Sequence, residues 1–183
     1  MAHDATEVIV RGLAVENGHV LLCRHVGKGY RYLPGGHVEF PEPARDALAR
    51  EMDEEAGADI AAGDLLLTHE HVFRQKGKLR HEVNLVFAMR LDAGTLPTPG
   101  THVPRGTSPS TNAPTTPAAP TSNTPTPAPA ALPKITSQEP DIAFDWVPIA
   151  GLDDADVRPA SMVGWIRAAA SGHAPVWLSE IHD

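Results

Sequence analysis

Four carboxylic acids lie within five residues of one predicted helix: Glu51, Asp53, Glu54 and Glu55. At about 100° per residue, Glu51, Glu54 and Glu55 share one narrow stripe of that helix, whereas Asp53 points away. Like charges at this spacing repel and weaken the helix unless a cation joins them. The stripe therefore predicts a site for a hard divalent cation. Mg²⁺ suits it, because this ion takes oxygen ligands and keeps waters that substrate phosphates can replace.

An arginine and a pair of glycines flank the acidic stripe. Arg50 directly precedes Glu51 and follows Glu42 by about two helical turns. A guanidinium can hold carboxylates in a fixed geometry through bidentate hydrogen bonds. Gly35 and Gly36 come just before the helix, where glycine lets the backbone turn and approach a ligand closely. We therefore expect Arg50 to orient the glutamates and a glycine carbonyl to face the metal.

Zinc is not the expected metal, because the sequence has no matching set of histidines and cysteines. His69 and His71 do share one face of a predicted strand. Paired histidines on a strand are usually packed or surface residues. We interpret these two in that way rather than as metal ligands.

The elements that must position these residues alternate between strand and helix. Residues 43–56 are predicted as a helix that begins near two prolines and ends at Gly57. The Glu-Asn-Gly sequence between two β-rich runs predicts a hairpin. The full expected order is strands 7–15, 19–25, 30–34, 65–73 and 79–91, then strand 144–149 and helix 159–170. This order predicts a mixed α/β domain with helices on both sides of a sheet.

Residues 96–133 break the pattern, since they are almost entirely proline, threonine, alanine, serine and asparagine. Prolines lack the backbone donor that helices and sheets need, and few large apolar residues are present to offset the cost of ordering. We predict a disordered insertion within a single domain of residues 1–183, because the strand that follows is too small to fold alone. The segment is interpreted as an inert tether, with a site for a proline-recognising partner as the alternative.

Composition and charge exclude several other classes of function. A net charge of -8 argues against binding to a nucleic acid backbone. The single cysteine, Cys23, excludes an internal disulfide and agrees with a reducing compartment. We find no signal peptide and no apolar stretch of roughly 20 residues, so no membrane partner is expected. These features predict a cytoplasmic protein, and a homodimer is left open.

One longer pattern contains the acids, the arginine and a glycine. It reads Gly, five residues, Glu, seven residues, Arg-Glu, an apolar residue, any residue, Glu-Glu, any residue, Gly, and an apolar residue. This pattern resembles the signature of the Nudix hydrolases, and the matching residues are Gly36, Glu42, Arg50, Glu51, Met52, Glu54, Glu55, Gly57 and Ala58. Met52 and Ala58 stand where a branched aliphatic residue is usual, a departure that concerns packing rather than chemistry. Residues 33–36 and 145–160 also look like parts of a Nudix domain.

The resemblance implies an α/β/α sandwich with a mixed β-sheet. It also implies Mg²⁺-dependent hydrolysis of a nucleoside diphosphate linked to another group, with Mn²⁺ as the substitute ion. Glu51, Glu54 and Glu55 would be metal ligands, one of which also activates water. Arg50 would orient these glutamates, and Gly36 would supply a backbone ligand. Metal ions at such a site neutralise the diphosphate and lower the pKa of an attacking water.

A further acid from a distant loop often completes such sites in the Nudix family. Glu139, which lies seven residues before Trp146, is the best-placed candidate. Asp141 and Glu82 are the alternatives.

The class of substrate can be narrowed only by excluding classes whose marker residues are absent. The family's proline for ADP-ribose hydrolases and its tyrosine for dinucleoside polyphosphate hydrolases are both absent from residues 72–78, and the upstream motif of coenzyme A hydrolases is missing. These absences favour a nucleoside or deoxynucleoside triphosphate. The C-terminal segment resembles that of the bacterial mutator-type triphosphatases. Ser161 stands near the position of their purine-binding asparagine, which argues against selectivity for guanine.

Arg24 and Arg31 are the candidates for contacts with substrate phosphates, and Tyr32 or Phe73 for stacking on the base. Two alternative functions stay open. One is an ADP-ribose or nucleotide-sugar pyrophosphatase. The other is a Nudix-fold module that binds a nucleotide without hydrolysing it. The complete set of glutamates argues against the second, because a pure binder has no need of every catalytic acid.

Overall fold

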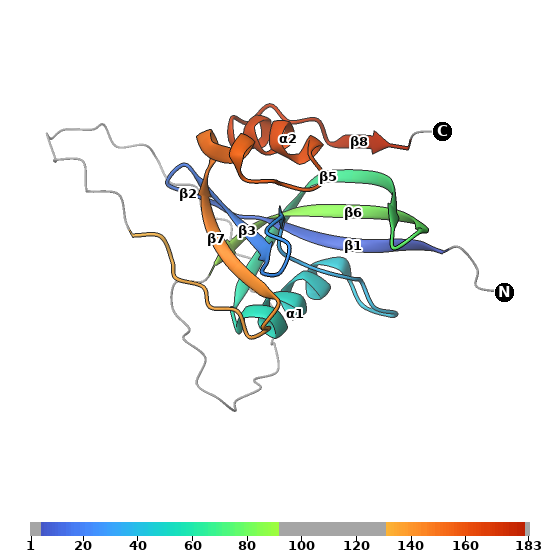
Figure 1. The fold of residues 1–183 in the computed structure, drawn as a ribbon. Coiled ribbons are helices and arrows are strands. Elements are labelled where there is room, and N and C mark those ends of the chain that lie inside the picture. Colours follow the sequence, from blue (N-terminus) through green and yellow to red (C-terminus); the bar gives the residue numbers. More distant parts are fainter. Residues whose placement is uncertain (1–4, 92–130, 182–183) are drawn as a thin grey trace, which may run out of the picture.

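The computed structural model describes residues 5–91 and 131–181, whose fold is shown in Figure 1. The predicted insertion, residues 96–133, lies outside the described residues except for its last three. The elements follow in the order β1 (Thr6–Leu13), β2 (Val15–Glu16), β3 (His19–His25), β4 (Arg31–Tyr32), α1 (Ala44–Ala56), β5 (Ile60–Gln75), β6 (Lys78–Leu91), β7 (Ile142–Pro148), the 3₁₀ helix η1 (Ile149–Asp154), α2 (Ser161–Ala170) and β8 (Trp177–Glu180). In this part of the chain, no helix is long and apolar enough to cross a membrane.

Two four-stranded sheets form the centre of the molecule. The first sheet has the strand order β1-β6-β5-β8, in which β1 is parallel to β6, β5 is antiparallel to β6, and β8 is parallel to β5. In the second sheet β3 pairs with β2, β4 and β7, each time antiparallel. Helix α1 lies on one side of the sheets and α2 on the other (Figure 1). The predicted mixed α/β sandwich is confirmed, but its strands are divided between two sheets.

Two tight turns connect antiparallel strands, and the first of them forms the predicted Glu-Asn-Gly hairpin. Asn17 and Gly18 have φ angles of 48° and 74°, and Lys76 and Gly77 have φ angles of 51° and 78°. Turns with two left-handed residues match the twist of the antiparallel strands that they connect. They join β2 to β3 and β5 to β6.

The predicted strand 7–15 is divided in the structure, and only its end belongs to the hairpin. β1 ends at Leu13 and pairs with β6 along its whole length. Ile9 and Val10, which point to opposite faces of the strand, are both buried, as is usual for a strand in parallel pairing. Strand β8 was not predicted, because its four residues carry too little alternation to stand out from a loop.

Helix α1 agrees with its prediction at both ends. It begins after Pro43 and ends at Gly57, whose φ of 58° is left-handed. N–H groups beyond its end donate to the carbonyls of Asp53 and Met52, at 2.7 and 3.2 Å. Leu48 and Met52 are fully buried in the core. Because this apolar face is fixed against the sheet, the acidic stripe of the helix is held toward the glycine turn.

Candidate active site

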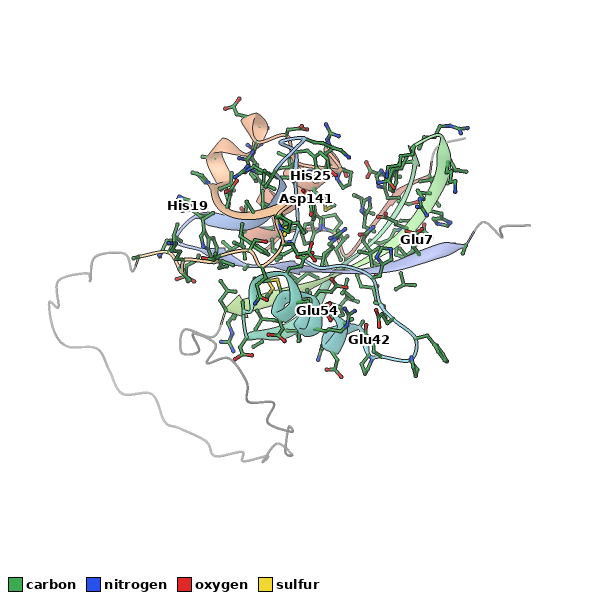
Figure 2. All side chains as sticks on the ribbon, turned by 60° about the horizontal axis from the view of Figure 1, so that its bottom comes forward. Glu7, His19, His25, Glu42, Glu54 and Asp141 are labelled. Carbon is green, nitrogen blue, oxygen red and sulfur yellow. The ribbon has the colours of Figure 1, made fainter. Side chains whose placement is uncertain are left out.

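Arg50, in the middle of α1, is the centre of a hydrogen-bonded cluster along one side of the helix. Its Nε and Nη2 atoms donate to the two carboxylate oxygens of Glu42, at 3.2 and 2.8 Å. Its Nη1 donates to Glu51 at 3.1 Å and to Glu54 at 3.0 Å, and Nη2 also donates to the carbonyl of His37 at 2.9 Å. Figure 2 shows Glu42 and Glu54 beside the helix. The expected orienting contacts of Arg50 are therefore present in the structure.

The charges of this cluster do not balance. Arg50 lowers the pKa of Glu42, with further help from the backbone N–H of Glu39, and the same contact raises the pKa of Arg50. One guanidinium thus faces three carboxylates, those of Glu42, Glu51 and Glu54. The excess negative charge makes the side of α1 that carries this cluster attractive to a cation.

Glu55 differs from its neighbours because it is buried. Its side chain is 9% exposed, and its carboxylate accepts a weak, 3.9 Å contact from the thiol of Cys23. Burial, followed by the charge of Glu51, raises the pKa of Glu55 to about 7. In the absence of a cation, this carboxyl group is therefore partly protonated near neutral pH.

The glycine turn lies directly against the acidic stripe. The segment 34–38 runs antiparallel to β1, and its Gly36 carbonyl accepts a hydrogen bond from the N–H of Val10 at 2.8 Å. Gly35 has a φ of 123°, and a Cβ there would lie 2.3 Å from the carbonyl oxygen of Val10. At Gly36 a Cβ would lie 2.4 Å from the carboxylate of Glu51. Only glycines permit this close approach of the backbone to the acids.

The groups that lie where the glycine turn meets the acidic stripe are chemically suited to bind Mg²⁺. Carboxylate oxygens and a backbone carbonyl are the donors that Mg²⁺ prefers. The donors here come from Glu51, Glu54, Glu55 and the turn at Gly36. Within residues 5–91 and 131–181, no three acidic, histidine or cysteine side chains already converge on one point. Arg50 holds Glu51 and Glu54 on its own guanidinium, so side-chain rotation would accompany metal binding.

The structure also brings Glu139 to this site from a distant part of the chain. The N–H of Gln138 donates to the carbonyl of Glu55 at 2.7 Å, and the hydroxyl of Ser137 donates to the same oxygen at 3.3 Å. The charge of Glu139 contributes to the raised pKa of Glu55. Asp141 is fixed elsewhere, since its carbonyl accepts a hydrogen bond from the N–H of Val26.

A cleft of about 760 Å³ opens beside the acids. Its walls include Gly36, Glu51 and Glu55 at the acidic end, and strands β1, β5 and β6 supply further lining residues. Tyr32 and Phe73, the candidates for base stacking, both line it. A volume of this size accommodates a nucleotide.

Arg24 and Arg31 do not line this cleft. They lie opposite each other on β3 and β4 and border a second hollow next to β7. Asp145 accepts hydrogen bonds from Arg24 at 2.7 Å and from Arg31 at 3.1 Å. The single carboxylate of Asp145 thus offsets part of the charge of these two arginines, which lie away from the acidic stripe.

Arg11 is a cation of the cleft that the sequence analysis did not identify, and Lys28, Arg74 and Arg158 also line this cleft. Its Nη1 donates to the carbonyls of Leu33 and Gly35, at 3.2 and 2.5 Å, and its guanidinium lies 5.3 Å from the ring centre of Tyr32. Its charge acts to lower the pKa of Glu55. In the described part of the chain no carboxylate forms an ion pair with it. The one available signal was a charged residue inside the apolar run Val-Ile-Val-Arg-Gly-Leu.

Replacing Arg11 with methionine is expected to lower kcat/KM by about 10- to 100-fold, because a charge-assisted hydrogen bond contributes about 1.5–3 kcal/mol. Arg11→Lys should recover part of this loss, since lysine keeps the charge but lacks the planar guanidinium group that donates to two carbonyls. Steady-state kinetics with Arg90→Met, a change at an exposed position of β6, provide the control. Equal activities of Arg11→Met and Arg90→Met would contradict a role for Arg11.

The sandwich, the helical acids and the glycine turn together define a class of protein, a hydrolase of phosphoanhydride bonds. A model of the family described as NUDIX domain matches residues 5–108, more than half of the chain. The protein therefore belongs to the NUDIX family, an enzyme family that acts on small nucleotide compounds and generally requires a divalent metal.

Solved structures share the fold at low sequence identity. The mutator MutT protein from Bacillus halodurans is 14% identical with a TM-score of 0.59, and the match covers 93% of this chain and 86% of that one. The MutT protein from Methanosarcina mazei Go1 is 17% identical with a TM-score of 0.58, covering 94% and 98%. A UDP-X diphosphatase is 17% identical with a TM-score of 0.57, covering 97% and 69%. At these identities the comparison concerns the fold alone.

Proposed function

We propose that this protein is a Mg²⁺-dependent hydrolase that cleaves a phosphoanhydride bond of a nucleoside triphosphate or deoxynucleoside triphosphate. The observation that carries the proposal is the cluster of Arg50 with its glutamates, which faces a glycine turn at the end of a cleft. An excess of carboxylates beside a cleft has a clear use when a cation and a polyphosphate bind there together.

Each residue has a distinct part in the proposed reaction. Glu51, Glu54, Glu55 and the Gly36 carbonyl would hold Mg²⁺, with Glu139 as an additional ligand. The bound ion would neutralise the diphosphate and lower the pKa of the attacking water. Arg50 keeps the glutamates oriented through its hydrogen bonds. Arg11 lies in the same cleft and would bind a phosphate oxygen.

Glu55 is the proposed general base of the reaction. Glu55 is buried at the acidic end of the cleft, and its carboxylate, kept ionised by the bound cation, could accept a proton from the attacking water. Glu54, with a side chain that is 56% exposed, lacks this burial and suits the role of a ligand.

A second candidate function is the hydrolysis of a nucleotide sugar or ADP-ribose. The fold is shared with a UDP-X diphosphatase, and a cleft of about 760 Å³ has room for a group larger than phosphate. The triphosphate is preferred because residues 72–78 lack the proline that marks many ADP-ribose hydrolases.

Incubation with Mg²⁺ and a panel of nucleoside triphosphates, nucleotide sugars and ADP-ribose, followed by chromatography of the products, tests the proposal. We expect the triphosphates to be the best substrates, and Glu54→Gln and Glu55→Gln to reduce turnover by about 100-fold or more, since each removes charge from the metal site. Asp53→Asn, on the opposite side of the same helix, is the matched control. Faster hydrolysis of a sugar nucleotide would select the second function. Binding without any turnover by a folded protein would select a non-catalytic module.

A further inference from the structure

The floor of the cleft contains a compact group of polar side chains away from the acidic stripe. His69 and His71 of β5 lie directly opposite Asn84 and Glu82 of β6, respectively, in the register of the two strands. All four side chains line the cleft. His69 and Asn84 are only 1% and 7% exposed, so they are among the most buried polar residues described. Polar groups at this depth require hydrogen-bond partners.

The histidines are held rigidly in place. Nε2 of His69 lies 2.7 Å from the carboxylate of Glu180, which also accepts a hydrogen bond from Ser161 at 2.8 Å. The ring of His71 is stacked between His69 and Phe73, with ring centres 5.5 and 4.7 Å apart and planes inclined by 18° and 20°. Both faces of the His71 ring are thus covered by neighbouring rings.

Asn84 and Glu82, by contrast, are not saturated by the protein. The amide of Asn84 donates to the carboxylate of Glu82 at 3.4 Å, a long hydrogen bond. In the described residues no other donor or acceptor contacts either side chain. The amide oxygen of Asn84 and one carboxylate oxygen of Glu82 thus remain as acceptors. Leaving such acceptors without a donor in a partly buried site costs free energy.

A donor group on the substrate would satisfy these acceptors. The exocyclic amino groups of adenine, cytosine and guanine are donors. Uracil presents a carbonyl oxygen in place of the cytosine amino group, and hypoxanthine has only hydrogen in place of the guanine amino group. We propose that Glu82 and Asn84 select nucleotides whose base carries an exocyclic amino group. This inference rests on the proposed function, because it places the base at the floor of the cleft while the phosphates lie at the acids.

The charges along the cleft agree with this placement. Glu82 would repel phosphates, whereas Arg11 would attract them. Burial, as the largest cause, lowers the pKa of His71, so that this imidazole is neutral near neutral pH. The His71 imidazole beside Glu82 therefore does not draw a phosphate away from the acidic end of the cleft, although Lys28, Arg74 and Arg158 also line it.

Pairs of substrates that differ in one amino group test the selection. The ratio of kcat/KM for CTP to that for UTP, and the ratio for GTP to that for ITP, are expected to be at least about 10, since a site built to hydrogen-bond a group rejects the analogue that lacks it. The corresponding deoxynucleotides should show the same ratios if the base rather than the ribose is recognised. Ratios near 1 in both pairs, in an enzyme that hydrolyses all four, would overturn the inference and leave the proposed function intact.

Glu82→Gln locates the selection in this residue. Glutamine can donate to the carbonyl oxygen of uracil as well as accept from an amino group, so we expect the ratio for CTP to UTP to fall by about 10-fold or more while UTP is still hydrolysed. Glu70→Gln is the matched control, since Glu70 lies on β5 with its carboxylate near Ser179 and outside the cleft lining. An equal loss for all substrates in Glu82→Gln would instead indicate a metal ligand and overturn the inference, as would unchanged ratios.

A binding measurement separates this inference from the proposed function. If no triphosphate is hydrolysed, the proposed function fails, and the selection can still be measured by calorimetry with α,β-methylene analogues of CTP and UTP. Preferential binding of the CTP analogue, lost in Glu82→Gln, would uphold the selection. Equal affinities would overturn it.

Discussion

Replacing Arg50 with lysine is expected to lower kcat/KM by about 100-fold or more, because a small displacement of catalytic groups has effects of that size. The planar guanidinium makes five hydrogen bonds in the structure, to three carboxylates and to one backbone carbonyl. Lysine carries the same charge but is a point donor that cannot match this geometry. The loss should therefore appear mainly in kcat, with Mg²⁺ held in excess.

Arg45→Lys is the control for the Arg50 variant. Arg45 lies on the same helix, but its guanidinium packs over the ring of Phe87 at 5.6 Å instead of contacting the acids. Steady-state kinetics of the two variants, together with their melting temperatures, distinguish a lost orientation from a general loss of stability. Matching activities of the two variants would show that the contacts of Arg50 have no catalytic importance.

Removing the buried carboxylate of Glu55 is expected to make the metal-free protein more stable above neutral pH. Burial and the neighbouring charge of Glu51 raise the pKa of Glu55 from 4.5 to about 7 in the folded protein. A group with a raised pKa in the folded state stabilises it fully below the unfolded value. This stability is lost as the pH rises through the folded value. The loss falls between pH 4.5 and about 7, and it amounts to at most about 3.5 kcal/mol at about 1.4 kcal/mol per pH unit.

Glu55→Gln removes this titration, because glutamine is neutral at every pH. Unfolding in denaturant, with a chelator present, should show that the free energy of unfolding of the variant rises relative to that of the wild type between about pH 5 and about pH 8. Glu54→Gln is the matched control, since that side chain is 56% exposed. Added Mg²⁺ should reverse the order at the higher pH, because a cation stabilises the ionised carboxylate of the wild type. A wild type and a Glu55→Gln variant with parallel pH profiles would disprove this account of Glu55.

A higher stability of metal-free Glu55→Gln than of the wild type would also bear on the function of Glu55. The same substitution is expected to abolish turnover while it stabilises the empty protein at higher pH. A residue that weakens the fold in the absence of its ligand is typical of a functional site. The two measurements together therefore identify Glu55 as a group retained for chemistry rather than for folding.

Local chemistry determined the helix and its cluster. The prolines and Gly57 define the ends of α1 by backbone sterics, which depend only on neighbouring residues. The contact of Arg50 with Glu54, four residues later, follows from helical spacing, for the same reason. The signature that resembled the Nudix hydrolases consists of these short-range relations, and for that reason the sequence alone could reveal the family and the acidic site.

Only the tertiary structure decided how the acids differ and what faces them. Glu54 and Glu55 are adjacent in sequence, yet one is exposed and the other buried, because the packing of Met52 sets the rotation of the helix. Arg24 and Arg31 are both bound by Asp145, a partner more than a hundred residues away. Pairings between distant strands obey no local spacing rule, so a charge that looked available in the sequence is already used in the fold.

The side chains of the cleft floor are likewise brought together by pairings between distant strands. Asn84 meets His69, and Glu82 meets His71, only through the register of β5 and β6, and Glu180 reaches His69 from strand β8, which carries no pattern of its own. Arg11 likewise enters the cleft because β1 leaves the hairpin and pairs with β6. The sequence by itself thus determined the helix, the acid cluster and the class of chemistry. The tertiary structure decided which charges remain free for a substrate, because that depends on contacts between residues far apart in the chain.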